Sequence, residues 1–169
     1  SLPAGWGLRE ALSGRTESAK ADIVKCEELI RTFDAYPLLY LGPTFEGLPL
    51  VHCDRQQSPG TDYGIPPTDS FAFVYGTCTI KPGDSACAVP LNVIIYPRCF
   101  AYPAEIPTET IRGAPAHSVR TGALLVNTPQ FRVKVSASTA ESDALVRRAF
   151  LQLRGANPLA AKLTVDKPL

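Results

Sequence analysis

The sequence predicts an α+β domain in which a mostly antiparallel sheet of six or seven strands packs against an N-terminal and a C-terminal amphipathic helix. Three observations lead to this class. The 169 residues are 45% hydrophobic and 20% charged, which is enough for one sizeable core. Short apolar stretches alternate with proline- and glycine-rich connections through the middle of the chain. Two stretches of helical periodicity flank them, and neither contains any of the sixteen prolines.

We expect a single folded domain over residues 16–157, preceded by a tail or short helix at 1–15 and followed by a tail at 158–169. The sequence begins at Ser1 and contains no methionine. Such a start is typical of a mature product, and it predicts that a signal or anchor segment was removed.

The first helix is expected over residues 16–34, where Ile23, Cys26, Ile30 and Phe33 recur with the spacing of one helical face. This apolar stripe predicts that the helix packs against the sheet.

The second helix is expected near residues 139–154. Ser138 and Glu141 have the Ser-x-x-Glu spacing of a capping box that would start it, and Gly155 would end it. Its apolar residues share one face, which we expect to pack on the sheet: Leu145, Val146, Ala149, Phe150 and Leu153.

Alternating or continuous apolar runs predict the strands. The first two are expected to form a hairpin through residues 42–47. Residues 56–70 contain three prolines and two glycines and are expected to be a surface loop. The expected strands cover 37–41, 48–53, 71–79, 91–96, 116–120, 123–127 and 130–137.

Five cysteines suggest a disulfide framework. Cys78 and Cys87 lie at the end of one expected strand and just before the next, so a hairpin-like return would bring them within bridging distance. We expect Cys53 and Cys99 as a second pair, which leaves Cys26 as a free thiol in the core. Because disulfides persist in oxidising compartments, the expected localisation is extracytoplasmic, either secreted or membrane-tethered.

Charge and hydropathy argue against several classes of partner. Seventeen basic and sixteen acidic residues give a net charge of +1 without blocks of like charge, so no nucleic-acid partner is expected. The longest apolar stretch, residues 86–97, is shorter than the ~20 residues of a membrane-spanning helix. Phosphate-loop, dinucleotide, nucleophile-elbow and zinc signatures are absent from the sequence, and we expect no cofactor and no metal.

Catalytic alternatives remain open at this stage. Cys53 or Cys99 could form a thiolate–imidazole pair with His117. His52 neighbours Cys53 on an expected strand, so the two side chains point to opposite faces. A zinc site could be assembled with a histidine from three of Cys53, Cys78, Cys87 and Cys99.

Loop carboxylates offer another alternative, as acid–base groups or calcium ligands. The candidates are Asp54, Asp62, Asp69 and Asp84.

Binding residues are expected on loops, where exposed aromatic side chains often contact partners. Phe45 and Glu46 lie in a glycine-bounded connection, and Tyr63 lies in the long loop. We therefore expect a non-enzymatic domain that binds a protein or small ligand through loops at one end of its sheet. A small enzyme and a structural subunit of a surface assembly are the alternatives.

Four patterns resemble uncharacterised bacterial secreted or membrane-anchored proteins. They are LGPxFEGLPL at 41–50, VYGxC at 74–78, CxxPLxV at 87–93 and RGxPA at 112–116. The resemblance spans residues 37–155. It implies an extracytoplasmic location and brings no activity, cofactor or partner with it.

Overall fold

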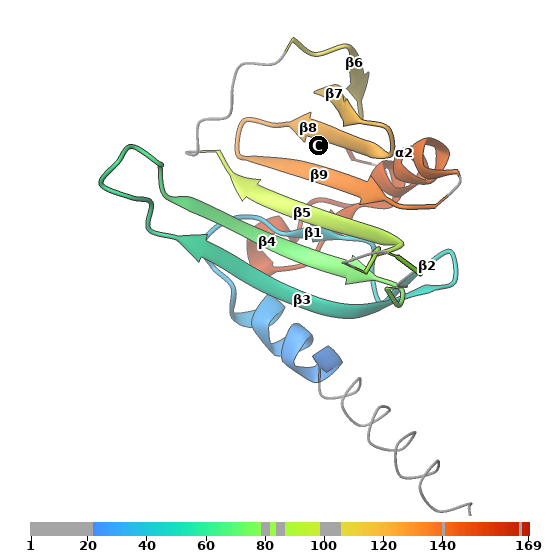
Figure 1. The fold of residues 1–169 in the computed structure, drawn as a ribbon, viewed down its shortest axis with the longest axis horizontal. Coiled ribbons are helices and arrows are strands. Elements are labelled where there is room, and N and C mark those ends of the chain that lie inside the picture. Colours follow the sequence, from blue (N-terminus) through green and yellow to red (C-terminus); the bar gives the residue numbers. More distant parts are fainter. Residues whose placement is uncertain (1–21, 79–81, 84–86, 99–105, 140, 166) are drawn as a thin grey trace, which may run out of the picture.

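An antiparallel sheet of eight strands forms the centre of the fold (Figure 1). The predicted tail at 1–15 and Cys99 lie outside the part of the chain that is described. The α+β class is confirmed, and the sheet has more strands than the six or seven expected. This computed structural model describes residues 22–78, 82–83, 87–98, 106–139, 141–165 and 167–169.

Every neighbouring pair of strands in the sheet is antiparallel. In spatial order the strands are β2 (Thr44–Phe45), β3 (Leu48–Ser58), β4 (Thr68–Tyr75), β5 (Leu91–Pro97), β9 (Phe131–Ala137), β8 (Ala123–Asn127), β7 (Ala114–Arg120) and β6 (Glu109–Ile111). A separate ribbon and two helical elements are β1 (Leu39–Tyr40), β10 (Arg154–Gly155), α2 (Ser142–Gln152) and the 3₁₀ helix η1 (Pro158–Ala160).

The core lies on one face of the central strands. In β4, β5 and β9 every second side chain is buried, as period-two alternation requires. Register aligns these residues in rows, for example Phe73, Val93 and Val135, all fully buried. Cross-strand contacts of this kind are the main unit of sheet stabilisation.

Two helices pack on this core face, one beside β3 and the other over β8 and β9 (Figure 1). Helix α2 packs on β8 and β9. Residues 22–32 are helical near β3, so the helix ends two residues before the predicted end at 34, and predicted residues 16–21 lie outside the described range. Phe33, just after this helix, packs edge-on against Phe71 of β4 with ring centroids 5.0 Å apart.

The predicted hairpin between residues 37–41 and 48–53 is wrong. Strand β1 pairs with β10 near the C-terminus, and β2 forms the hairpin with β3. Its two-residue turn is Glu46–Gly47, with φ of 47° and 80°. Both values are left-handed, as in the tight turns that match the twist of paired strands. The Glu-Gly dipeptide within the predicted loop therefore sets the register.

The predicted capping box is also wrong. Helix α2 begins after Glu141, which makes no side-chain capping hydrogen bond. The Ser138 hydroxyl instead donates to the carbonyl of Val89. Asp143, in the first turn of α2, accepts a hydrogen bond of 2.7 Å from the Gly122 amide. The helix start is thus tied to the turn between β7 and β8.

Arg112 holds the C-terminal end of α2, which Gly155 was expected to cap. This arginine occupies the first position of the β6–β7 turn with a left-handed φ of 50°. Its guanidinium donates hydrogen bonds of 2.6 to 3.1 Å to the last carbonyls of the helix and to the C-terminal segment. The acceptors are the carbonyls of Phe150, Leu153, Thr164 and Lys167.

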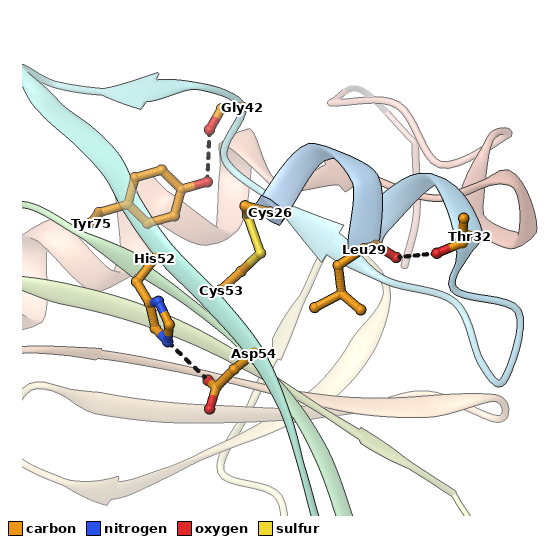
Figure 2. The surroundings of a disulfide bond; sticks show 8 residues. All are labelled: Cys26, Leu29, Thr32, Gly42, His52, Cys53, Asp54 and Tyr75. Carbon is orange, nitrogen blue, oxygen red and sulfur yellow. Dashed lines mark hydrogen bonds and ion pairs between the residues drawn. A yellow bond between two sulfur atoms is a disulfide. The ribbon is translucent and has the colours of Figure 1, made fainter. Parts of the chain in front are cut away.

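Two disulfides join the described cysteines. Cys78 and Cys87, the pair that the sequence predicts, are bonded with Cα atoms 5.3 Å apart. Cys26 and Cys53 form the other bond, with Cα atoms 5.4 Å apart (Figure 2). The expected Cys53–Cys99 pair and the free thiol at Cys26 are therefore wrong. Cys53 lies on the core face of β3, and the helical stripe that carries Cys26 faces it.

Candidate functional site

A groove of about 680 Å³ opens between the helix at 22–32 and the strands β1, β2 and β3. We call it the apolar groove. Ile23 and Ile30 line it from the helix, and Leu50 lines it from β3. The third wall is the segment from Gly155 through η1. Ile30 and Leu50 are buried, so they form its floor.

Asn157 fixes the third wall to the segment that follows the helix. Its side-chain amide donates to the carbonyls of Phe33 and Tyr36 at 3.0 and 2.9 Å. Its carbonyl oxygen accepts a hydrogen bond of 2.9 Å from the Leu38 amide. With both donors and the acceptor engaged inside the protein, this buried side chain shapes the groove without offering polar contacts to a ligand.

Few backbone groups around the apolar groove are available for hydrogen bonding. Its prolines have no amide hydrogen, and they contribute hydrocarbon instead. The polar side chains of the lining include the hydroxyls of Tyr40 and Thr44, with Glu27 and Arg31 exposed on the helix. The lining prolines are Pro43, Pro49 and Pro158. Lining amides already bonded within the protein include those of Leu50, Gly155 and Ala156.

Tyr75 holds the connection from β1 to β2 against the sheet. Its hydroxyl donates to the carbonyl of Gly42 at 2.8 Å (Figure 2). It also accepts a hydrogen bond of 2.9 Å from the Leu41 amide. Burial raises the pKa of Tyr75, so the hydroxyl stays protonated and able to donate. The connection that lines the groove is therefore anchored in the core.

A second groove of about 530 Å³ adjoins the first at Thr44, which lines both. We call it the polar groove. Glu46, at the β2–β3 turn, forms a two-oxygen ion pair with Arg148 of α2. The hydrogen bond from Arg148 lowers the pKa of Glu46. The complete lining comprises Leu41, Thr44, Phe45, Glu46, Arg148, Leu151, Gln152 and Arg154.

Arg154 lies where the two grooves meet. Its guanidinium carbon is 6.0 Å from the centroid of the Tyr40 ring, and one nitrogen lies 3.4 Å from the Leu41 carbonyl oxygen. A Cβ atom at Gly42 would overlap this guanidinium, so glycine makes room for it. Within the described chain, the ion pairs do not include Arg154.

The predicted binding residues are not brought together. Phe45 is 7% exposed and belongs to the core, so it is not the loop aromatic that the sequence suggested. Glu46 is exposed but paired with Arg148. Tyr63 is 97% exposed in the β3–β4 loop, at the opposite end of the sheet from β2 (Figure 1).

Replacing Tyr63 by alanine is expected to change the free energy of unfolding by less than about 0.5 kcal/mol, because a side chain this exposed buries almost nothing on folding. Urea denaturation followed by circular dichroism measures the change. A loss above about 2 kcal/mol would show that the loop packs on the domain.

Disulfide bonds engage three of the four cysteines in the catalytic alternatives, and the fourth, Cys99, lies outside the described residues. Cys53 is disulfide-bonded and cannot act as a thiolate beside His117, which is buried on β7. Cys78 and Cys87 are likewise bonded, so these thiols cannot bind zinc. Across the described positions, no group of three His, Cys, Asp or Glu residues is placed to hold a metal ion.

Two of the candidate aspartates lie on strands rather than in loops, Asp54 on β3 and Asp69 on β4. Asp69 pairs with Arg55 and accepts a hydrogen bond from the Tyr36 hydroxyl. Asp54 lies 3.8 Å from the Nε2 atom of exposed His52 (Figure 2). Asp62 is exposed in the β3–β4 loop, and Asp84 lies outside the described residues.

Sequence reasoning missed both grooves because each is assembled from distant segments. The apolar groove combines residues 23–31, 40–50 and 155–161. One signal was present, since the LGPxFEGLPL pattern puts two prolines and a tight turn next to an apolar strand. The C-terminal part of the lining was expected to be a tail.

No protein-family model, curated protein or solved structure matches this chain. In the ranges that the structure describes, no helix is long and apolar enough to cross a membrane. The two grooves are therefore interpreted from their own geometry.

Proposed function

We propose that the chain is an extracytoplasmic binding domain that holds a predominantly apolar ligand in the apolar groove. The groove itself carries this proposal. Its volume of about 680 Å³ falls within the roughly 300–1,000 Å³ of typical ligand sites. Such sites combine a hydrocarbon lining with a few polar groups, as this one does.

Binding is favoured over catalysis by the chemistry of the lining. The described residues that line the apolar groove include no histidine and no cysteine. Its carboxylate, Glu27, is exposed on the helix surface. These walls can exclude water from an apolar ligand.

The disulfides support an oxidising compartment. Cys26–Cys53 links the helical wall of the apolar groove to β3, and Cys78–Cys87 closes the connection between β4 and β5. Both bonds are compatible with the oxidising conditions outside the cytoplasm, where disulfides persist.

The neutral fluorophore N-phenyl-1-naphthylamine tests the proposal. We expect saturable binding with a fluorescence increase, and Ala161→Trp should weaken it about tenfold or more by filling the groove. Ala161 lines the groove and is exposed, so the larger side chain should not disturb the core.

The matched control is Ala144→Trp, because Ala144 is also an exposed alanine and lies on α2, outside the lining of both grooves. This variant should bind the fluorophore like the unchanged chain. Unsaturable binding, or equal binding by both tryptophan variants, would contradict the proposal.

A further inference from the structure

The apolar groove ends beside an arginine. Tyr40 lines the apolar groove, and Arg154 lines the polar groove with its guanidinium carbon 6.0 Å from the Tyr40 ring centroid. Thr44 belongs to both linings. A ligand that lies along the apolar groove and passes over Tyr40 therefore meets this guanidinium.

Arg154 has donors to spare. A guanidinium has five N–H donors, and among the described residues the Arg154 side chain makes one hydrogen bond, a long one of 3.4 Å to the Leu41 carbonyl. The planar fork of an arginine matches the oxygens of a carboxylate or phosphate. These N–H groups can therefore donate hydrogen bonds to an anionic group without breaking a strong contact.

The charge balance of the polar groove also favours an anion. Among the charged side chains that line it, Glu46 is engaged by Arg148 through both oxygens. Arg154 is the lining cation that has no carboxylate partner among the residues that the structure describes. At the helical wall of the apolar groove, by contrast, Glu27 and Arg31 balance each other in charge.

The lining of the apolar groove favours a hydrocarbon chain over a peptide. Each residue of an extended peptide brings an N–H and a C=O group that must be hydrogen-bonded when it leaves water. Three lining residues are prolines, and the amides of Leu50, Gly155 and Ala156 are already bonded within the protein. A hydrocarbon tail has no such requirement.

From these contacts we propose that the ligand is a single-chain anionic amphiphile. Its tail lies in the apolar groove, and its carboxylate or similar anionic head binds the Arg154 guanidinium in the polar groove. This inference rests on the proposed function, because it names the class of ligand that the apolar groove takes.

Dansyl-labelled undecanoic acid and its methyl ester test the proposal by fluorescence titration. The unchanged chain should bind the acid about tenfold more tightly than the ester. Arg154→Gln should remove that preference, because it should weaken binding of the acid about tenfold and leave binding of the ester unchanged. The control is Arg147→Gln, because Arg147 is an arginine of α2 that pairs with Glu109 and lines neither groove; it should keep the preference.

Arg154→Lys covers the case in which Arg154→Gln does not fold. It keeps the positive charge, so it should still bind the acid more tightly than the ester. A lysine variant that folds and shows no preference would overturn the inference.

The two proposals fail in different ways. Equal binding of acid and ester, with both weakened by Ala161→Trp, would overturn the anionic head group and leave the apolar groove as the binding site. Binding of neither compound would contradict both proposals. A leucine-rich peptide with a free C-terminal carboxylate that binds more tightly than the acid would overturn the hydrocarbon tail.

Discussion

Replacing Phe150 by alanine is expected to lower the free energy of unfolding by about 3–5 kcal/mol. Phe150 is fully buried on α2, which packs against β8 and β9. The substitution removes a large apolar side chain and leaves a cavity in a close-packed region. Urea denaturation followed by circular dichroism measures the loss.

The neighbouring Leu151 provides the control. It is 55% exposed on the same helix, so Leu151→Ala should cost less than about 1 kcal/mol. A loss below about 1 kcal/mol for Phe150→Ala as well would show that this face of α2 does not pack on the sheet.

Removing the Cys26–Cys53 bond by replacing both cysteines with alanine is expected to cost about 3.5 kcal/mol. The bonded cysteines are separated by 27 positions in the sequence. The expected cost follows from the conformational entropy that a cross-link over this distance removes from the unfolded chain. Both cysteines are also buried, so lost packing adds to the cost. Guanidinium denaturation measures the change.

The matched comparison removes Cys78–Cys87 in the same way. Its sequence separation is 9, for which the same relation gives about 2.6 kcal/mol. Both of these cysteines are exposed, so little packing is lost with them. If their removal were the more costly of the two, the role assigned to Cys26–Cys53 in fixing the helix would be wrong.

Sequence patterns predicted three central strands and one disulfide, because each of these features depends on residues that are close in the sequence. The alternation in 71–79, 91–96 and 130–137 located β4, β5 and β9, because strand periodicity is set by the pleat. Cys78 and Cys87 could be paired because they flank a single connection. They are only 9 positions apart, so a chain reversal between the two strands brings the two cysteines together.

Long-range pairings could not be predicted in this way. Strand β1 pairs with β10 across more than 110 residues of sequence, and nothing in either two-residue segment specifies the other. Cys26 pairs with Cys53 because the helix covers β3, which is a tertiary contact. The predicted capping box does not form, because the Ser138 hydroxyl donates its hydrogen bond to the Val89 carbonyl, which lies outside the helix.

The apolar groove was not predicted from the sequence, because none of the expected binding residues lines it. The sequence drew attention to Phe45 and Glu46, yet the Glu46–Gly47 turn directs Phe45 inward and the carboxylate of Glu46 toward Arg148. Arg154 carried no sequence signal, because its role depends on Tyr40 and the glycine at 42. Groove residues from three segments converge only in the folded chain.

Intermolecular nuclear Overhauser effects test the central claim most directly. With methyl-labelled isoleucine and leucine and bound undecanoate, we predict effects between the ligand chain and the methyl groups of Ile30 and Leu50, which form the floor of the apolar groove. Ile65, which is 61% exposed in the β3–β4 loop, should show none. Effects at Ile65 without effects at Ile30 and Leu50 would place the ligand on the loop and contradict the apolar groove as the binding site.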